Sequence, residues 1–382
     1  MRPLAVAALA LAIAACAAPP LRGTGDLGLV VERGSGRVML VETTGRSPLG
    51  RIEGLGDLSH ASMVFSRDGR YAYVFGRDGG LTKVDLLRSR IERRVIQAGN
   101  SIGGAISQDG RLVAVANYKP GGIRIFDAGT LEPLAEVPTG AKVVGIADAP
   151  GNRFVFSLFE AGEIWIVDAS DPRRPGVRKI GGVGRQPYDG FITPNGRYYI
   201  AGLFGEDGLA LVDLWEPQAG ARRILAGYGR GEEPLPVYKM PHLRGWAVAG
   251  RYIFLPAIGR HEVLVLDSVT WTEAGRVAVH GQPVFAVAQP GGQRVWVNFA
   301  FPNNGVVQVI DVPALKVVRE LQPGRAVLHL EFTPRGEQAW ISSRDDGAVV
   351  VLDTATYAEL ARLPAASPSG IFLTSRGAMT GF

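Results

Sequence analysis

The chain has 382 residues, of which 46% are apolar, 51 are glycine and 25 are proline. Its net charge of +5 is modest for this length and it contains no lysine-rich or arginine-rich run, which argues against a nucleic-acid partner. The abundance of glycine and proline, with few helix-length amphipathic stretches, predicts an all-β chain of short strands joined by tight turns.

The N-terminus has the features of an exported lipoprotein. One arginine precedes an apolar run that is too short to span a bilayer and ends in the sequence IAAC. This ending resembles a lipobox, so we expect residues 1–15 to be a signal peptide, Cys16 to be lipidated and residues 16–26 to be a tether. An ordinary signal peptide with a stray cysteine is the alternative. Because Ala17 follows the cysteine, the resemblance implies a periplasmic protein anchored at the outer membrane.

Cysteine chemistry is restricted by the same residue. Cys16 is the only cysteine in the chain. If it is acylated, the mature protein has no thiol for a disulfide, a Cys-ligated zinc, an iron–sulfur cluster or a covalent c-type haem.

From residue 27 onward, an apolar strand that ends in an acidic residue recurs eight times. The acids are Glu42, Asp85, Asp127, Asp168, Asp213, Asp267, Asp311 and Asp353. They are 41 to 45 residues apart, except for one interval of 54. This period is typical of a four-stranded propeller blade, and it predicts eight blades.

Glycine-containing turns such as RDGR and PNGR precede seven of these acids and mark hairpins with glycine at positive φ. We therefore expect each blade to contain strands A to D, with A innermost and C ending in the acid. The first unit starts at its strand B, LGLVVER, whereas the C-terminus carries an extra strand-A pattern, SGIFLTSRG. Pairing of these two segments would close the ring and make residues 27–382 one eight-bladed propeller.

Three of the five histidines occupy one phase of the repeat. His60, His242 and His280 lie just ahead of strand A, in D–A connections that emerge near the axis. Loops on a rigid scaffold commonly carry function, so these are the candidate catalytic and cofactor-binding histidines. His261 is expected to be a solvated turn residue, and His329, within a strand A, is as readily a packed channel residue as a functional one.

Basic residues occupy the B–C turns on the same face: Arg33, Arg77, Lys119, Arg260 and Arg344. A single turn arginine is usually just solvated. Several basic residues around a funnel, however, suit a ligand with several carboxylates, because arginine binds carboxylates in a bidentate manner. We predict that the five share a rim and that Arg33 and Arg77 pair with ligand carboxylates.

Several site types can be compared on this basis. Three imidazoles could hold zinc or copper, but they come from distant units without the short spacing of a local metal site. The sequence has no G-x-S-x-G elbow for a hydrolase and no dinucleotide fingerprint for NAD. A quinoprotein-like dehydrogenase would need a calcium-binding acid cluster, and a YVTN-type interaction scaffold would need no histidines in phase. An iron macrocycle, with one histidine on one side and others opposite, fits better.

The stretch HASMVFSRDGRYAYVFGRDGG, which begins at His60, and VVERGSGRVMLVE before it resemble the haem d1-binding propeller of cytochrome cd-type nitrite reductase. The resemblance implies that His60 is the axial ligand of the haem iron and that Arg33 and Arg77 contact the macrocycle's carboxylates. It also implies that His242 and His280 match the family's two distal histidines.

The chain departs from that reductase because it lacks a cytochrome c domain, so nitrite reduction is not expected. A d1-like propeller with a lipoprotein leader and no c-type haem is similar to the NirF family of haem d1 biosynthesis proteins. This resemblance implies binding of haem d1 or a late precursor. It also implies partnership with other haem d1 biosynthesis proteins and with cytochrome cd-type nitrite reductase. Two activities remain open: an oxidoreductase that dehydrogenates a tetrapyrrole side chain, and a non-catalytic carrier or assembly scaffold.

Overall fold

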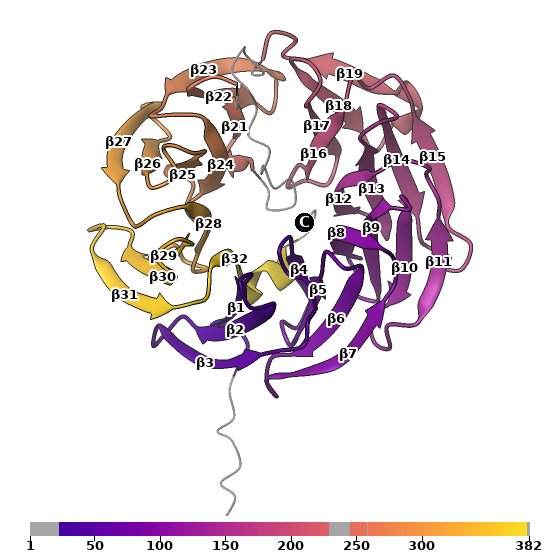
Figure 1. Ribbon diagram of the computed structural model, residues 1–382. Helices are drawn as coiled ribbons and strands as arrows, with labels where there is room; N and C mark the ends of the chain where they lie inside the picture. Colours follow the sequence, from indigo (N-terminus) through magenta and orange to yellow (C-terminus); the bar gives the residue numbers. More distant parts are fainter. Residues whose placement is uncertain (1–22, 229–244, 258, 380–382) are drawn as a thin grey trace, which may run out of the picture.

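Short antiparallel strands follow one another through the described chain, which comprises residues 23–228, 245–257 and 259–379 of a computed structural model. They form eight four-stranded sheets arranged around one axis (Figure 1). The predicted eight-bladed propeller is confirmed. None of the helices in these residues is long and apolar enough to cross a membrane.

The first four blades are described here by their strands, in order from the innermost to the outermost. They are β32 (Pro368–Leu373), β1 (Leu27–Glu32), β2 (Arg37–Glu42) and β3 (Ser47–Ile52); β4 (Ser62–Phe65), β5 (Tyr71–Phe75), β6 (Gly80–Asp85) and β7 (Arg90–Ile96); β8 (Asn100–Ile106), β9 (Leu112–Lys119), β10 (Ile123–Asp127) and β11 (Pro133–Val137); and β12 (Val143–Ala149), β13 (Arg153–Leu158), β14 (Glu163–Asp168) and β15 (Gly176–Ile180).

The remaining four blades follow the same order. They are β16 (Pro187–Ile192), β17 (Tyr198–Leu203), β18 (Leu209–Asp213) and β19 (Ala221–Ile224); β20 (Ala247–Ala249), β21 (Tyr252–Ala257), β22 (Glu262–Asp267) and β23 (Thr272–Ala278); β24 (Pro283–Ala288), β25 (Arg294–Phe299), β26 (Val307–Asp311) and β27 (Lys316–Leu321); and β28 (Val327–Phe332), β29 (Gln338–Ser343), β30 (Ala348–Asp353) and β31 (Glu359–Pro364). Two 3-10 helices are η1 (Pro217–Ala219) and η3 (Thr374–Ala378).

The sequence markers fall where the repeat predicts. Each of the eight acids is the last residue of the third strand of its blade. The seven turn glycines between first and second strands all have positive φ, from 60° to 95°: Gly69, Gly110, Gly151, Gly196, Gly250, Gly291 and Gly336. Such backbone conformations favour glycine because it has no Cβ atom, which explains why these turns recur.

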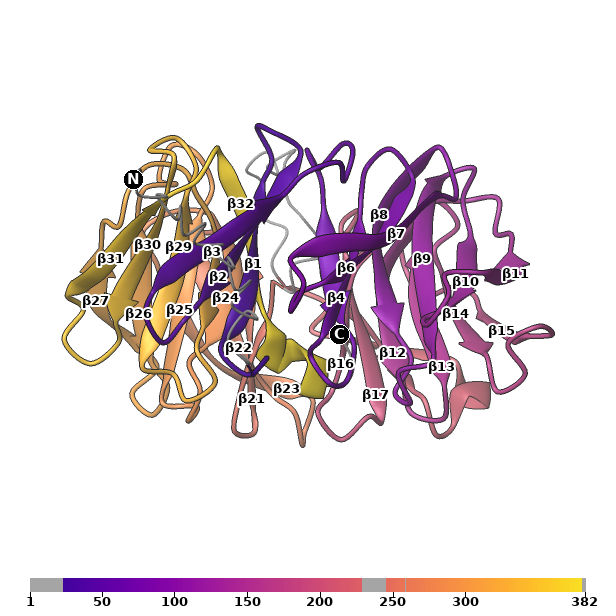
Figure 2. The same cartoon turned by 90° about the horizontal axis from the view of Figure 1, so that it is seen from below.

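The ring closes through its two ends. β1 pairs with β32 in an antiparallel register that sets Leu29 opposite Phe372 and Val30 opposite Ile371, as predicted. η3 follows β32 and lies on the face that carries the A–B turns, at the lower edge of Figure 2. The D–A connections and B–C turns therefore emerge on the other face.

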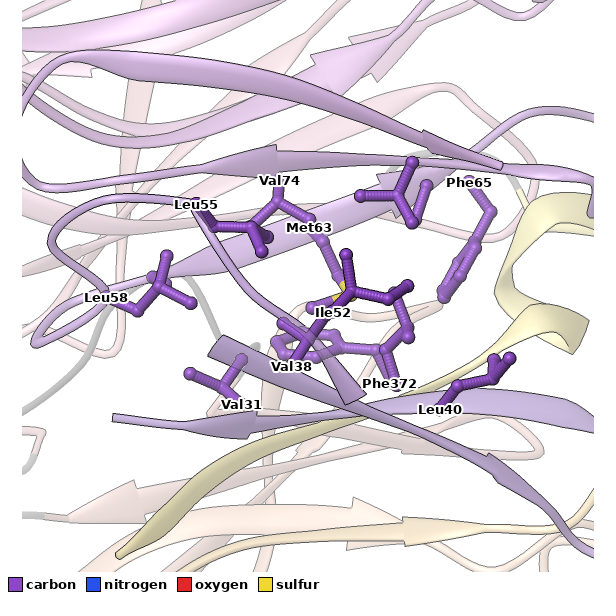
Figure 3. Packing of buried hydrophobic residues seen from close by; sticks show 14 of the residues in the cluster. Val31, Val38, Leu40, Ile52, Leu55, Leu58, Met63, Phe65, Val74 and Phe372 are labelled. Carbon is purple, nitrogen blue, oxygen red and sulfur yellow. The ribbon is translucent and has the colours of Figure 1, made fainter. Parts of the chain in front are cut away.

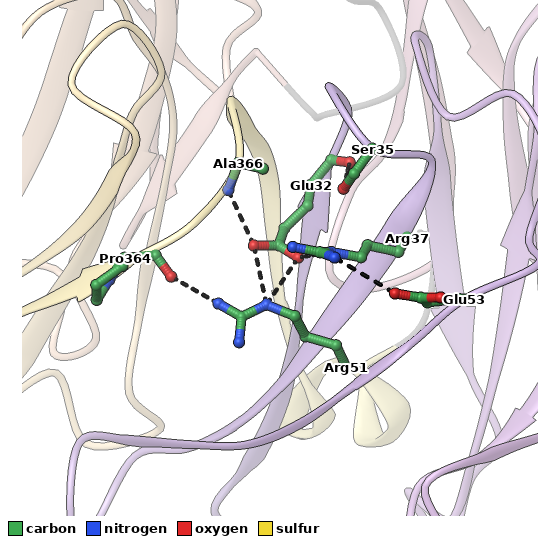
Figure 4. Close-up of polar contacts among 7 residues, drawn as sticks. All are labelled: Glu32, Ser35, Arg37, Arg51, Glu53, Pro364 and Ala366. Atoms are coloured by element: carbon green, nitrogen blue, oxygen red, sulfur yellow. Dashed lines mark hydrogen bonds and ion pairs between the residues drawn. The ribbon is translucent and has the colours of Figure 1, made fainter.

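Glu32, the last residue of β1, strengthens this closure (Figure 4). Its side chain is 0% exposed and accepts hydrogen bonds from Arg37 Nε at 2.6 Å and Arg51 Nε at 3.1 Å. It also accepts one from the amide of Ala366 at 2.9 Å, in the segment that leads into β32. One buried carboxylate thus joins the N-terminal blade to the C-terminal segment.

The connection that carries His60 rests on a hydrophobic cluster between the first two blades (Figure 3). Leu55 and Leu58, from the β3–β4 connection, are each 1% exposed and pack with residues such as Met63, Val74 and Phe372. Removing a buried leucine side chain typically costs about 2–5 kcal/mol, so this packing fixes the connection strongly.

We predict that Glu32→Ala lowers the free energy of unfolding by about 2 kcal/mol, because the partly buried Ala366 amide loses its acceptor and two arginines lose a shared partner. Glu53→Ala is the matched control, since Glu53 is largely exposed and, among the residues that the structure describes, its one ion pair is with Arg37 at 3.3 Å. It should cost about 1 kcal/mol or less. Urea unfolding measures both, and equal losses would contradict the closure role of Glu32.

Candidate functional site

The segment before His60 is held between two B–C turns. Asp57 Oδ1 accepts a hydrogen bond from the Ser59 amide at 2.8 Å, and the Asp57 carbonyl accepts one from the Arg77 amide at 2.8 Å. On the other side, the Arg33 guanidinium donates to the Ser59 carbonyl. These contacts and the buried leucines below fix the position of His60 beside both arginines.

His60, Arg33, Arg77 and Arg344 line a cavity of about 1070 Å³ on this face, which we call the funnel cavity. Its basic side comes from the first, second and eighth blades. Its other side is aromatic and apolar and includes Phe285, Phe299 and Phe301 of the seventh blade, together with Tyr118 and Tyr188. The cavity thus offers positive charge along one side and aromatic surface along the other.

The arginines of the funnel cavity differ in how their charge is balanced. Arg344 Nε lies 2.7 Å from Asp345, and Arg325 Nε lies 2.6 Å from Asp346. Within the described ranges, neither Arg33 nor Arg77 forms an ion pair. Burial and the nearby charges of Arg344 and Arg77 lower the pKa of Arg33. The site is therefore electrostatically unfavourable without an anion, and carboxylates would relieve it.

His60 is neutral in this environment. Burial, followed by the charges of Arg77 and Arg33, lowers its pKa to about 4, and Asp57 opposes this shift only in part. A neutral imidazole has a lone pair available for a metal, whereas a protonated one does not. The same arginines that would attract an acidic ligand thus keep His60 in the form that can bind iron.

Of the other two predicted histidines, the described residues include only His280, which does not line the funnel cavity. His242 and Cys16 lie outside the described residues. His280 has its Nδ1 3.3 Å from Glu320 of β27, and its ring centroid is 6.1 Å from that of Phe299. Its imidazole therefore lies behind a cavity residue, next to an acid of the outermost strand.

The remaining predicted basic residues and histidines do not line the funnel cavity. Lys119 and Arg260 are exposed and are not among the residues that line the funnel cavity, so the predicted rim of five contains three lining members. His261 is exposed, and His329 is a buried residue of the first strand of its blade. In the described part of the chain, no group of three or more His, Cys, Asp or Glu side chains could hold a bare metal ion.

Sequence reasoning missed Arg325 and the aromatic side of the cavity. Arg325 lies in a D–A connection, the phase that singled out His60, so extending the phase argument to arginine would have found it. Tyr118 and Lys119 are the last two residues of β9, so Lys119 ends a strand instead of occupying the predicted turn, and Tyr188 lies in β16. Single aromatic residues in strands carry no comparable signal, because most of them pack in the core.

Comparison with known proteins identifies the family. Residues 22–377 match the sequence profile described as Cytochrome D1 heme domain. Protein NirF of Stutzerimonas stutzeri is 58% identical over 389 residues, which cover 100% of both chains. The chain belongs to the NirF family. Protein NirF of Pseudomonas aeruginosa is 56% identical over 384 residues, 98% of each chain, and membership of this family supports a role in haem d1 biosynthesis.

A solved structure shares the propeller fold of this chain. The structure of "Dihydro-heme d1 dehydrogenase NirN in complex with DHE" matches with a TM-score of 0.80 and 25% identity, over 95% of this chain and 78% of that one. The similarity therefore extends around nearly the whole ring.

In the ligand-free protein we predict that His60 titrates near pH 4, and an NMR titration of its imidazole resonances measures this pKa. Arg77→Gln should raise this pKa, because it removes one of the two charges that oppose protonation, whereas Arg344→Gln should leave it nearly unchanged. The lowered pKa also means that the unfolded chain binds more protons, so His60 should decrease stability as pH falls from about 6.5 to 4. A pKa that stays near 6.5 would contradict the described environment.

Proposed function

We propose that the chain binds haem d1 or a late tetrapyrrole precursor in the funnel cavity as part of haem d1 biosynthesis. The observation that carries this proposal is the pair of guanidiniums of Arg33 and Arg77, which form no ion pair within the described residues and lie beside a neutral His60. A flat macrocycle with several acidic side chains complements it, since the carboxylates pair with the arginines and the ring faces contact the aromatic residues. The family assignment supports the same ligand class.

In this proposal His60 would hold the iron, and Arg33 and Arg77 would orient the macrocycle through its carboxylates. The iron tetrapyrrole would supply redox chemistry when bound. The chain's own contribution is to hold the imidazole neutral and to fix the edge of the ligand. Arg344 and Arg325 already have acidic partners. They would therefore add to the electrostatic potential of the cavity but would not pair directly with the ligand.

The opposite face of the ligand is assigned to His242 and His280, as distal ligand or proton donor. His280 could take this role only by leaving Glu320, so His242 is the first candidate. Replacing either by alanine should impair haem d1 formation while His60 still binds the iron.

The activity we favour is dehydrogenation of a tetrapyrrole side chain, and the similarity to a structure named a dehydrogenase supports it. The reaction would break two C–H bonds of the side chain to form a C=C bond, passing two electrons to an external acceptor and releasing two protons to solvent. Incubation of the purified protein with dihydro-haem d1 and an added acceptor tests this. Pigment recovered with two hydrogen atoms fewer is the expected result. Unchanged pigment that passes to cytochrome cd-type nitrite reductase would favour the carrier.

We further propose that the protein is anchored by a lipid on Cys16 and faces the periplasm, at the outer membrane. The sequence IAAC after a short apolar run supports this proposal. Mass spectrometry of the native protein should find a lipid-modified N-terminal Cys16, and an unmodified Met1 terminus would overturn it.

For ligand affinity we predict a contrast between two arginines of one cavity. Arg77→Ala should weaken tetrapyrrole binding about tenfold to a hundredfold, because a charge-assisted pair with a carboxylate is lost. Arg344→Ala should weaken it by only about threefold or less, because that side chain already pairs with Asp345. Spectrophotometric titration measures the affinity of both variants. Equal small losses of affinity would show that neither arginine lies in a closed pocket.

A further inference from the structure

The B–C connection of the seventh blade differs in length from those of the other seven blades. It comprises residues 300–306, between β25 and β26, whereas the other B–C connections have three to five residues. Four residues of this connection line the funnel cavity: Phe301, Pro302, Asn304 and Gly305. The extra length therefore places additional side chains at the outer end of the cavity.

Phe301 is the most exposed large apolar side chain among the residues that the structure describes, at 73%. It lies two residues after Phe299, which ends β25 and is only 2% exposed. Both line the funnel cavity, so Phe299 is part of its inner wall and Phe301 extends this aromatic surface toward the solvent. A ligand that fills the cavity would remove part of the Phe301 ring from water, which is favourable for binding.

Hydrogen bonds hold the backbone that carries Phe301. The Asn303 amide donates to the Ala300 carbonyl at 2.9 Å and closes the turn that contains Phe301. The Ala300 amide donates to the carbonyl of Gln282 at 2.9 Å, in the connection between β23 and β24. A contact between this phenylalanine and a ligand therefore costs less conformational entropy than a contact from a flexible loop.

We propose that Phe301 packs over the outward side of the bound tetrapyrrole and slows its release, an inference that rests on the proposed function. In that function Arg33 and Arg77, from the first and second blades, pair with the carboxylates at one edge of the macrocycle. Charge pairing at that edge leaves the apolar ring in contact with water elsewhere. The seventh blade supplies the aromatic surface that covers it, and Phe301 is the outermost part of this surface.

The test measures the affinity for haem d1 and the dissociation rate of the complex. Phe301→Ala should weaken binding about tenfold, and the loss should appear mainly as faster dissociation, because the contact holds a ligand that has already entered. The loss should be nearly the same at low and high ionic strength, since no charge is removed. Phe301→Tyr keeps the ring and should retain the wild-type affinity and dissociation rate.

Val269→Ala is the matched control. Val269 is 69% exposed but lies in the turn between β22 and β23, on the face that carries the A–B turns. Its replacement should leave haem d1 binding unchanged, and neither alanine variant should change the Tm of the ligand-free protein, because both side chains are exposed.

The outcomes separate this inference from the proposed function. A wild-type protein that does not bind haem d1 would overturn both. Binding by wild type with an unchanged affinity and dissociation rate in Phe301→Ala would overturn only the role of Phe301. So would an equal loss of affinity in Val269→Ala, or a loss in Phe301→Tyr as large as that in Phe301→Ala.

Discussion

The antiparallel pairing of β1 with β32 is the contact that holds both the ring and its site together. Each blade packs its two faces on its neighbours, so a ring with a gap would expose two apolar surfaces. Glu32 joins the same two segments, and Arg33 follows it directly in the turn that reaches the funnel cavity. Phe372 of β32 also packs under the connection that carries His60. The contacts that close the ring therefore also position residues of the site.

Much of this fold was predictable because its signals are local and repeated. The acid that ends each third strand and the glycine turn before it recur in register, and the glycines are required by backbone conformations that other residues rarely adopt. The phase of His60, Arg33 and Arg77 within the repeat was sufficient to bring them to one cavity, since each repeat is placed by rotation about the same axis.

The phase of a residue fixes its backbone position but not the direction of its side chain. His280 has the predicted phase, yet its imidazole lies beside Glu320, an acid on an outermost strand that no repeat pattern singles out. The place of the two tyrosines in the funnel cavity became visible only when the blades were arranged around the axis. The tautomer of His329 likewise depends on an amide more than forty residues away, in β32.

The two ends of the central channel differ in charge: at one end Arg33 and Arg77 form no ion pair within the described residues, whereas at the other end Arg376 pairs with Glu331. The proposal that His60 holds the iron at the first end is best examined by the optical spectrum of the protein reconstituted with haem d1. Wild type and His261→Ala, an exposed histidine outside the cavity, should show the same histidine-ligated spectrum, and His60→Ala should lose it while keeping its fold. An unchanged spectrum in His60→Ala would show that another group holds the iron.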